Sequence, residues 1–96
     1  MENEFARTEL LIGSEGLARL RAASVMVLGV GGVGSHCIEA LVRSGVGKLI
    51  LVDHDRVSVS NINRQSIAMH STVGQYKTRV MKAKIEDISP QTEVIT

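Results

Sequence analysis

The sequence predicts an α/β fold, the N-terminal part of a Rossmann-like parallel sheet with flanking helices. Two apolar segments, residues 24–28 and 48–52, have the length and composition of buried strands. The first leads directly into Gly29-Val30-Gly31-Gly32-Val33-Gly34, and the second ends on Asp53, 19 residues after Gly34. A helical pattern lies between them. A strand, a glycine-rich turn, a helix, a second strand and an acid in this order are typical of a dinucleotide-type unit.

We divide the chain into an N-terminal helical segment, residues 1–22, and the first part of the sheet domain, residues 23–96. In the first segment, apolar residues mixed with charges predict a short helix over 3–12 that ends at Gly13. A second helix over 15–22 has an apolar stripe, Leu17 and Leu20, that we expect to pack on the sheet. Its arginines, Arg19 and Arg21, are expected to face water.

The last residues of the sequence predict the beginning of a third strand. Residues 88–92, Ile-Ser-Pro-Gln-Thr, indicate the end of a helix and a turn, and residues 93–96 have a strand-like composition. A parallel sheet is buried on both faces, and two strands with part of a third are too few to form one. We therefore expect the chain to be a fragment of a longer domain.

The glycine-rich turn is suited to an anion. Gly29 can make the tight turn out of the strand, Gly31 and Gly32 let the backbone approach a ligand, and Gly34 allows close packing of helix on strand. A phosphate would then meet free N–H groups at the positive end of the helix dipole. Such turns also occur for purely structural reasons, so the glycines alone leave both interpretations open. Asp53, placed to accept ribose hydroxyls, favours a nucleotide.

The first helix of the sheet domain is predicted over 33–44, with Gly45 as its C-terminal cap. Its apolar side consists of Val33, Cys37, Ile38 and Leu41. Cys37 is therefore interpreted as a small buried hydrophobic residue. The other face, with His36, Glu39 and Arg43, is expected to be solvated.

The last helix is predicted over 77–88, with a buried stripe of Val80, Met81, Ile85 and Ile88. Lys77 opens it, where the helix dipole disfavours a cation. Anionic phosphates at the same point would explain that placement. Further cations follow at Arg79, Lys82 and Lys84, for which a solvated helix face and an RNA contact are the alternatives.

The loop after Asp53 concentrates polar residues. Asp55 is interpreted as a turn or cap carboxylate, with a metal ligand as the alternative. Asn61 and Arg64, three apart on one turn, are expected to project toward the same space, where the planar guanidinium suits phosphate oxygens. His54 and His70 have no partner pattern and are interpreted as surface residues.

Composition excludes several classes. The formal net charge of +1 gives no global argument for a nucleic-acid partner, and the apolar segments are too short for a membrane span. The single cysteine excludes an internal disulfide and a cysteine-based zinc site. The N-terminus lacks the pattern of a secretory signal, so we expect a cytoplasmic location.

Four motifs carry a resemblance to a known family: the glycine-rich turn, Asp53-His54-Asp55, Ser60-Asn61-Ile62-Asn63-Arg64-Gln65 and Val73-Gly74-Gln75-Tyr76-Lys77. In their order and spacing the chain resembles the ubiquitin-activating-enzyme-like adenylyltransferases, which include activators of the molybdopterin and thiamine sulfur carriers. It is most similar to the branch that dehydrates threonylcarbamoyladenosine in transfer RNA.

The resemblance implies that the protein uses ATP and Mg²⁺ as cofactors and forms a homodimer. Its implied catalytic cations are Arg64, Lys77 and Arg7, the last reaching the ATP of the neighbouring subunit. Its implied nucleotide-binding residues are Gly29, Gly31, Gly32, Gly34, Asp53, Ser60, Asn61, Arg64 and Lys77. The family's Mg²⁺-binding aspartate would lie beyond Thr96, so we assign no metal ligand here.

The implied function is ATP-dependent adenylation of a carboxylate, followed by cyclising dehydration of N6-threonylcarbamoyladenosine in tRNA. An alternative is activation of the C-terminal glycine of a sulfur-carrier or ubiquitin-like protein, and a cysteine-desulfurase-type partner is also implied. A different class is a non-catalytic or NAD-type nucleotide-binding module. The cations Arg64 and Lys77 favour ATP over a nicotinamide cofactor, because an enzyme that transfers hydride has no γ-phosphate for them to bind.

Overall fold

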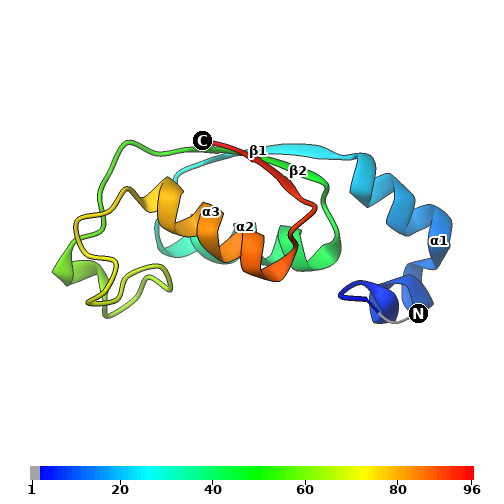
Figure 1. Cartoon of the computed structure of the whole chain (residues 1–96), viewed down its shortest axis with the longest axis horizontal. Helices are drawn as coiled ribbons and strands as arrows, with labels where there is room; N and C mark the ends of the chain where they lie inside the picture. The colour runs from blue at the N-terminus through cyan, green and yellow to red at the C-terminus, as the bar shows by residue number, and fades with distance from the viewer. Residues whose placement is uncertain (1–2) are drawn as a thin grey trace.

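The computed structural model describes residues 3–96 (Figure 1). The elements, in chain order, are α1 (Ala6–Ala22), β1 (Ser24–Leu28), α2 (Gly32–Ser44), β2 (Lys48–Val52), the short 3₁₀ helix η1 (Val59–Asn61), α3 (Lys77–Ile88) and β3 (Glu93–Ile95). No helix in this part of the chain is long and apolar enough to cross a membrane.

The three strands form one parallel sheet in the order β1-β2-β3. Val25 of β1 is in register with Leu49 of β2, which is in register with Val94 of β3. Figure 1 shows α2 and α3 on the same side of this sheet. The predicted α/β fold is therefore confirmed, with the first two strands and the last helix at their predicted residues.

The core lies between the sheet and the two helices. Six of its fully buried side chains come from β2 (Leu49, Leu51), from α2 (Ile38, Val42) and from α3 (Met81, Ile85), and Val30 and Ile67 join them from loops. Truncating one of these to alanine would cost about 2–5 kcal/mol. The opposite face of the sheet is open in the described residues, where Met26, Leu28, Val52 and Ile95 are exposed.

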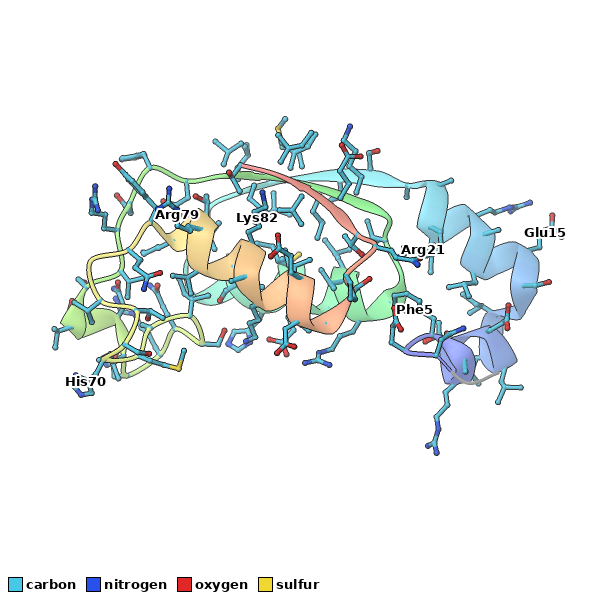
Figure 2. All side chains as sticks on the ribbon, viewed as in Figure 1. Phe5, Glu15, Arg21, His70, Arg79 and Lys82 are labelled. Carbon is cyan, nitrogen blue, oxygen red and sulfur yellow. The ribbon has the colours of Figure 1, made fainter. Side chains whose placement is uncertain are left out.

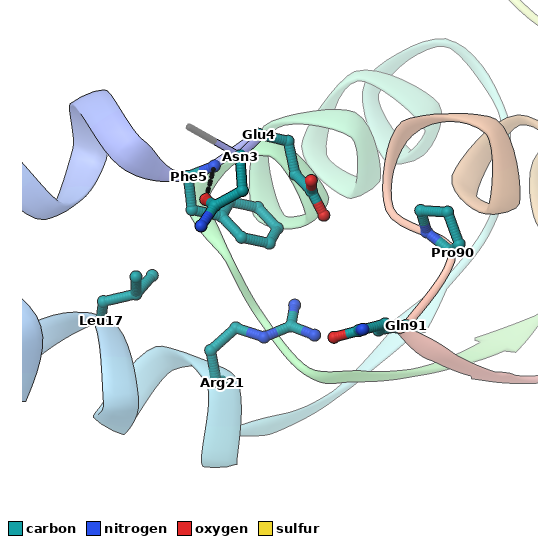
Figure 3. Close-up of a pocket in the computed structure, with 7 residues that line it drawn as sticks. All are labelled: Asn3, Glu4, Phe5, Leu17, Arg21, Pro90 and Gln91. Atoms are coloured by element: carbon teal, nitrogen blue, oxygen red, sulfur yellow. Dashed lines mark hydrogen bonds between the residues drawn. The ribbon is translucent and has the colours of Figure 1, made fainter. Parts of the chain in front are cut away.

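The N-terminal segment contains two helical pieces, as predicted. Gly13 interrupts α1 with φ of 80° and ψ of 166°, which is not helical. The expectation that Arg21 faces water is wrong. Its guanidinium lies beside the Phe5 ring (Figure 3), with the guanidinium carbon 5.0 Å from the ring centre. Its Nη1 is 3.4 Å from both the Gly45 carbonyl oxygen and Thr92 Oγ1. An arginine stem packs well on apolar surface, and its head has an affinity for aromatic faces.

Two expectations for α2 are wrong. Val33 and Cys37 are exposed, while Ser35, Ile38 and Val42 are the buried residues of this helix. Positions 33, 37 and 41 and positions 35, 38 and 42 form two neighbouring stripes on one helix, and packing against α3 buries the second. The predicted cap is confirmed, because Gly45 has φ of 109°.

Glu39, expected in solvent, is half-buried between α2 and α3. Its carboxylate pairs with Lys84 at 3.0 Å and with Arg43 at 3.1 Å. The hydrogen bond from Lys84 lowers the pKa of Glu39, helped by Arg43 and opposed by partial burial. Lys84 is therefore engaged in an ion pair between the two helices.

The predicted stripe of α3 is confirmed, with Val80, Met81 and Ile85 buried and Ile88 packed against the core.

Candidate nucleotide site

The predicted nucleotide residues gather at one edge of the sheet. The glycine-rich turn follows β1, Asp53 follows β2, and the backbone N–H of Lys77 at the start of α3 donates to the Asp55 carbonyl oxygen at 3.1 Å. The carboxyl ends of parallel strands meet at the same edge, where ligands of open α/β sheets bind. Arg7 does not join them, because Figure 1 shows α1 at the opposite end of the sheet.

Two glycines of the turn are required by the fold, Gly29 by its backbone conformation and Gly34 by packing. Gly29 has φ of 98° and its N–H donates to the Val52 carbonyl oxygen at 2.8 Å, which turns the chain sharply out of β1. A Cβ on Gly34 would collide with the carbonyl oxygen of Gly29 and lie 2.8 Å from its carbon. Gly34 therefore allows α2 to approach the strand, as predicted.

The other two glycines leave open space. The nearest atom to a Cβ built on Gly31 is Gln65 Nε2 at 3.7 Å, and for Gly32 it is the Arg64 carbonyl oxygen at 4.0 Å. The first-turn amides of α2, those of Gly32, Val33 and Gly34, have no hydrogen-bond acceptor among residues 3–96. Together they offer unpaired donors at the positive end of a helix, which suits a phosphate.

Asp53 connects the glycine-rich turn to the loop after β2. Its Oδ2 accepts the N–H of Val30 and its Oδ1 accepts the N–H of Asp55, each at 2.8 Å. Partial burial alone would raise the pKa of Asp53, but these two hydrogen bonds and the charge of Lys77 outweigh it and lower the pKa. Each oxygen keeps a further lone pair, so the ionised carboxylate can still accept ribose hydroxyls.

Lys77 is the buried cation of this edge. Only 7% of the residue is exposed, and α3 begins there without a side-chain cap. Its charge is one of the influences that lower the pKa of Asp53. A buried cation at a helix N-terminus is unfavourable by itself. An anionic ligand would offset that cost.

Asn61 and Arg64 do not share one surface. Asn61 is 8% exposed, and its Oδ1 accepts the N–H of Ser58 at 3.0 Å, so it caps η1. Arg64 is exposed, and its Nη1 donates to the Ser60 carbonyl oxygen at 3.1 Å and to Asn63 Oδ1 at 2.9 Å. Local hydrogen bonding thus holds both groups within their own turn. Their expected roles at the triphosphate remain predictions.

The sequence interpretation gave no role to Gln65, which lies beside the glycine-rich turn. Its side chain is buried, and its Oε1 has no hydrogen-bond partner within the described residues. A buried acceptor left unpaired is costly, so a donor from a bound molecule or water is expected there. The signal available in the sequence was its place in the motif Asn63-Arg64-Gln65.

The acidic cluster beside the site is not a built metal centre. Asp53, His54 and Asp55 offer ligand atoms within 4.8 Å of one another. However, both oxygens of Asp53 already accept backbone amides, and the side chain of His54 is 98% exposed, 3.4 Å from Asp55. Asp55 organises the loop through its backbone, accepting from the N–H of Lys77. We assign no metal ligand among residues 3–96.

The fold and this edge define a class: an α/β domain with a candidate nucleotide site at the carboxyl ends of its parallel strands. Within that class the chain belongs to the ThiF family, whose model matches residues 5–96. It is 58% identical over 95 residues to the tRNA threonylcarbamoyladenosine dehydratase of Bacillus subtilis, covering 99% of this chain and 37% of that protein.

Two further relatives are informative. The crystal structure of E. coli tRNA N6-threonylcarbamoyladenosine dehydratase, TcdA, in complex with ATP is 41% identical, with a TM-score of 0.93 over 96% of this chain and 38% of that one. The sulfur carrier protein adenylyltransferase of Thermus thermophilus is 40% identical over 83 residues, 86% of this chain and 31% of that protein. The chain thus spans about 37% of the length of its B. subtilis relative.

Proposed function

We propose that the protein containing this chain is an ATP-dependent tRNA threonylcarbamoyladenosine dehydratase. The observation that carries the proposal is the 58% identity to the B. subtilis dehydratase across 99% of the chain, against 40% to the T. thermophilus sulfur carrier protein adenylyltransferase. The glycine-rich turn, Asp53 and Lys77 support it, because they meet at one edge of the sheet. That edge is suited to ATP.

The proposed reaction begins with a carboxylate. An oxygen of the threonylcarbamoyl carboxylate attacks the α-phosphate of ATP, and pyrophosphate leaves. A nucleophile within the same nucleoside then attacks the activated carbonyl, AMP leaves with the carboxylate oxygen, and the ring closes with net loss of water. Such chemistry asks for alignment and charge stabilisation more than for acid or base catalysis.

Different residues of this chain are proposed to bind different parts of ATP. We assign the phosphates to the free amides of Gly32 and its neighbours, the ribose to Asp53, and the triphosphate charge to Lys77 and Arg64. The last assignment requires Arg64 to exchange its contacts with Ser60 and Asn63 for phosphate oxygens. Mg²⁺, when bound, would neutralise further phosphate charge.

We also propose a homodimer in which Arg7 completes the site of the partner subunit. Arg7 is exposed on α1, and α1 lies at the opposite end of the sheet from the glycine-rich turn (Figure 1), so it is badly placed for its own site. Mixing an Arg7→Ala subunit with a Lys77→Met subunit should restore activity in the mixed dimer, because one of its two sites regains both cations. Verified mixed dimers without activity would exclude sharing between subunits.

The tRNA assignment is tested by mass spectrometry of tRNA nucleosides from cells lacking the gene, extracted so that the labile ring stays closed. We expect the cyclic nucleoside to disappear. The second candidate, activation of a sulfur carrier, is favoured by the similarity to the T. thermophilus relative. Persistence of the cyclic nucleoside, with loss of an adenylated carrier C-terminus, would establish it instead. Co-purification with a cysteine-desulfurase-type protein would test that partner.

A further inference from the structure

Besides Arg64 and Lys77, which are already assigned to the nucleotide, three cations near the nucleotide edge have no carboxylate partner among residues 3–96. Three other cations of the described residues are paired: Arg19 with Glu15 at 3.3 Å, and Arg43 and Lys84 with Glu39. Arg56, Arg79 and Lys82 have no acidic partner within 4 Å among residues 3–96. With a formal net charge of only +1, this is a local concentration of positive charge rather than a property of the whole chain.

An aromatic ring lies against one of these cations, and it belongs to the residue that precedes the helix carrying the other two. The Arg56 guanidinium carbon lies 4.0 Å from the centre of the Tyr76 ring, and its Nη1 donates to the Gly74 carbonyl oxygen at 2.8 Å. Arg56 and Tyr76 also form an isolated antiparallel bridge. The guanidinium is therefore held over the ring of a tyrosine that is 41% exposed. Figure 2 places Arg79 and Lys82 on the first turns of α3, at the end that Tyr76 directly precedes.

We propose that Arg56, Tyr76, Arg79 and Lys82 form a surface that binds the RNA backbone of the substrate beside the nucleotide site. Unpaired cations interleaved with an exposed aromatic ring suit phosphodiesters and stacked bases. The surface adjoins Lys77, so a strand lying on it would deliver its nucleoside to the bound ATP. Lys84, for which the sequence left an RNA contact as an alternative to a solvated helix face, is removed from this surface by its pair with Glu39.

This inference rests on the proposed function, and its test separates the two. The full-length protein is titrated with bulk bacterial tRNA at several salt concentrations, and ATP affinity is measured in parallel. The slope of log K against log salt concentration is negative, and each lost phosphate contact reduces its magnitude by about 0.7–0.9. The variant Arg56→Gln/Arg79→Gln should therefore reduce the magnitude of this slope by about 1.4–1.8. ATP affinity should stay unchanged.

The matched control is Arg19→Gln/Arg43→Gln, which removes the same charge from exposed arginines that are already paired. It should leave the slope at the wild-type value. Tyr76→Ala should weaken tRNA binding by about 5-fold or more, whereas Tyr76→Phe, which keeps the ring, should bind like the wild type. This pair separates stacking from any effect of the hydroxyl.

Three outcomes would overturn the inference. Equal slopes for the two double variants, with tRNA still bound, would exclude this surface and leave the proposed function standing. A parallel loss of ATP affinity in Arg56→Gln/Arg79→Gln would indicate a distorted nucleotide site instead of a lost RNA contact. A wild-type protein that binds ATP but no tRNA would refute the proposed function, and the surface with it.

Discussion

Gly32 and Gly34, two residues apart, separate the folding role of the glycine-rich turn from its binding role. In Gly34→Ala the new methyl group would collide with the Gly29 carbonyl, which is backbone and cannot rotate away. In Gly32→Ala the nearest atom is 4.0 Å distant, an ordinary contact. The two substitutions add the same group to the same helix. We therefore expect Gly34→Ala to lower stability and Gly32→Ala to lower ATP affinity.

The expected magnitudes follow from these contacts. Overpacking against backbone should destabilise Gly34→Ala by about 3 kcal/mol, near the upper end of such costs. For a protein of the relevant size this lowers Tm by about 6–12 °C. Gly32→Ala should unfold at or slightly above the wild-type Tm, because alanine is favoured over glycine in a helix. Its methyl group should keep a phosphate from the helix amides, and losing one charge-assisted hydrogen bond weakens ATP binding about 10- to 150-fold.

The assay is thermal unfolding and ATP calorimetry on the full-length protein. Gly32→Ala with wild-type ATP affinity would refute the assignment of that amide to the phosphates. Gly34→Ala with wild-type Tm would refute the packing explanation. A Gly32→Ala variant that loses stability and ATP binding together would show that the open space beside Gly32 is needed by the protein itself.

Three further substitutions test single residues. Lys77→Met keeps the buried stem and removes the charge, so adenylation should fall about 100-fold or more with little change in Tm; equal losses of both would mean a structural role. Asp53→Asn should lower stability at neutral pH, where the carboxylate accepts two amides, by about 1–2 kcal/mol. Because the folded pKa of Asp53 is lowered from 3.8, the wild type should lose this advantage as the pH falls below about 4, and urea unfolding at pH 7 and pH 3 should show the two proteins converging. Arg21→Ala should cost about 1–2 kcal/mol through lost contacts with Phe5, Gly45 and Thr92, while Arg19→Ala changes stability by less than about 0.5 kcal/mol in the same denaturation experiment.

Local patterns were sufficient to predict the sheet and its glycines. Both complete strands, the last helix and the cap at Gly45 lie where the sequence places them, because apolar runs and glycine conformations are set by nearby residues. The convergence of the glycine-rich turn and Asp53 at one edge also follows from topology, since both come after parallel strands.

Tertiary contacts explain what local patterns missed. Helical spacing cannot decide which of two neighbouring stripes on α2 meets α3, so Cys37 was expected inside and lies outside. Arg21 belongs to an ordinary charged helix by sequence, and its partners Phe5, Gly45 and Thr92 are distant along the chain. A sequence motif cannot show that Gln65 Oε1 lacks a hydrogen-bond partner, because this depends on which groups surround the buried side chain.

The central claim, adenylation of a carboxylate on tRNA, is tested most directly by following one oxygen atom. The full-length protein is given ATP, Mg²⁺ and tRNA whose threonylcarbamoyl carboxylate carries oxygen-18. If that carboxylate attacks the α-phosphate, ring closure must release AMP with the label on its phosphate, together with unlabelled pyrophosphate and the cyclic nucleoside. Label in inorganic phosphate would mean attack at the γ-phosphate, and cyclic product with unlabelled AMP would contradict adenylation altogether.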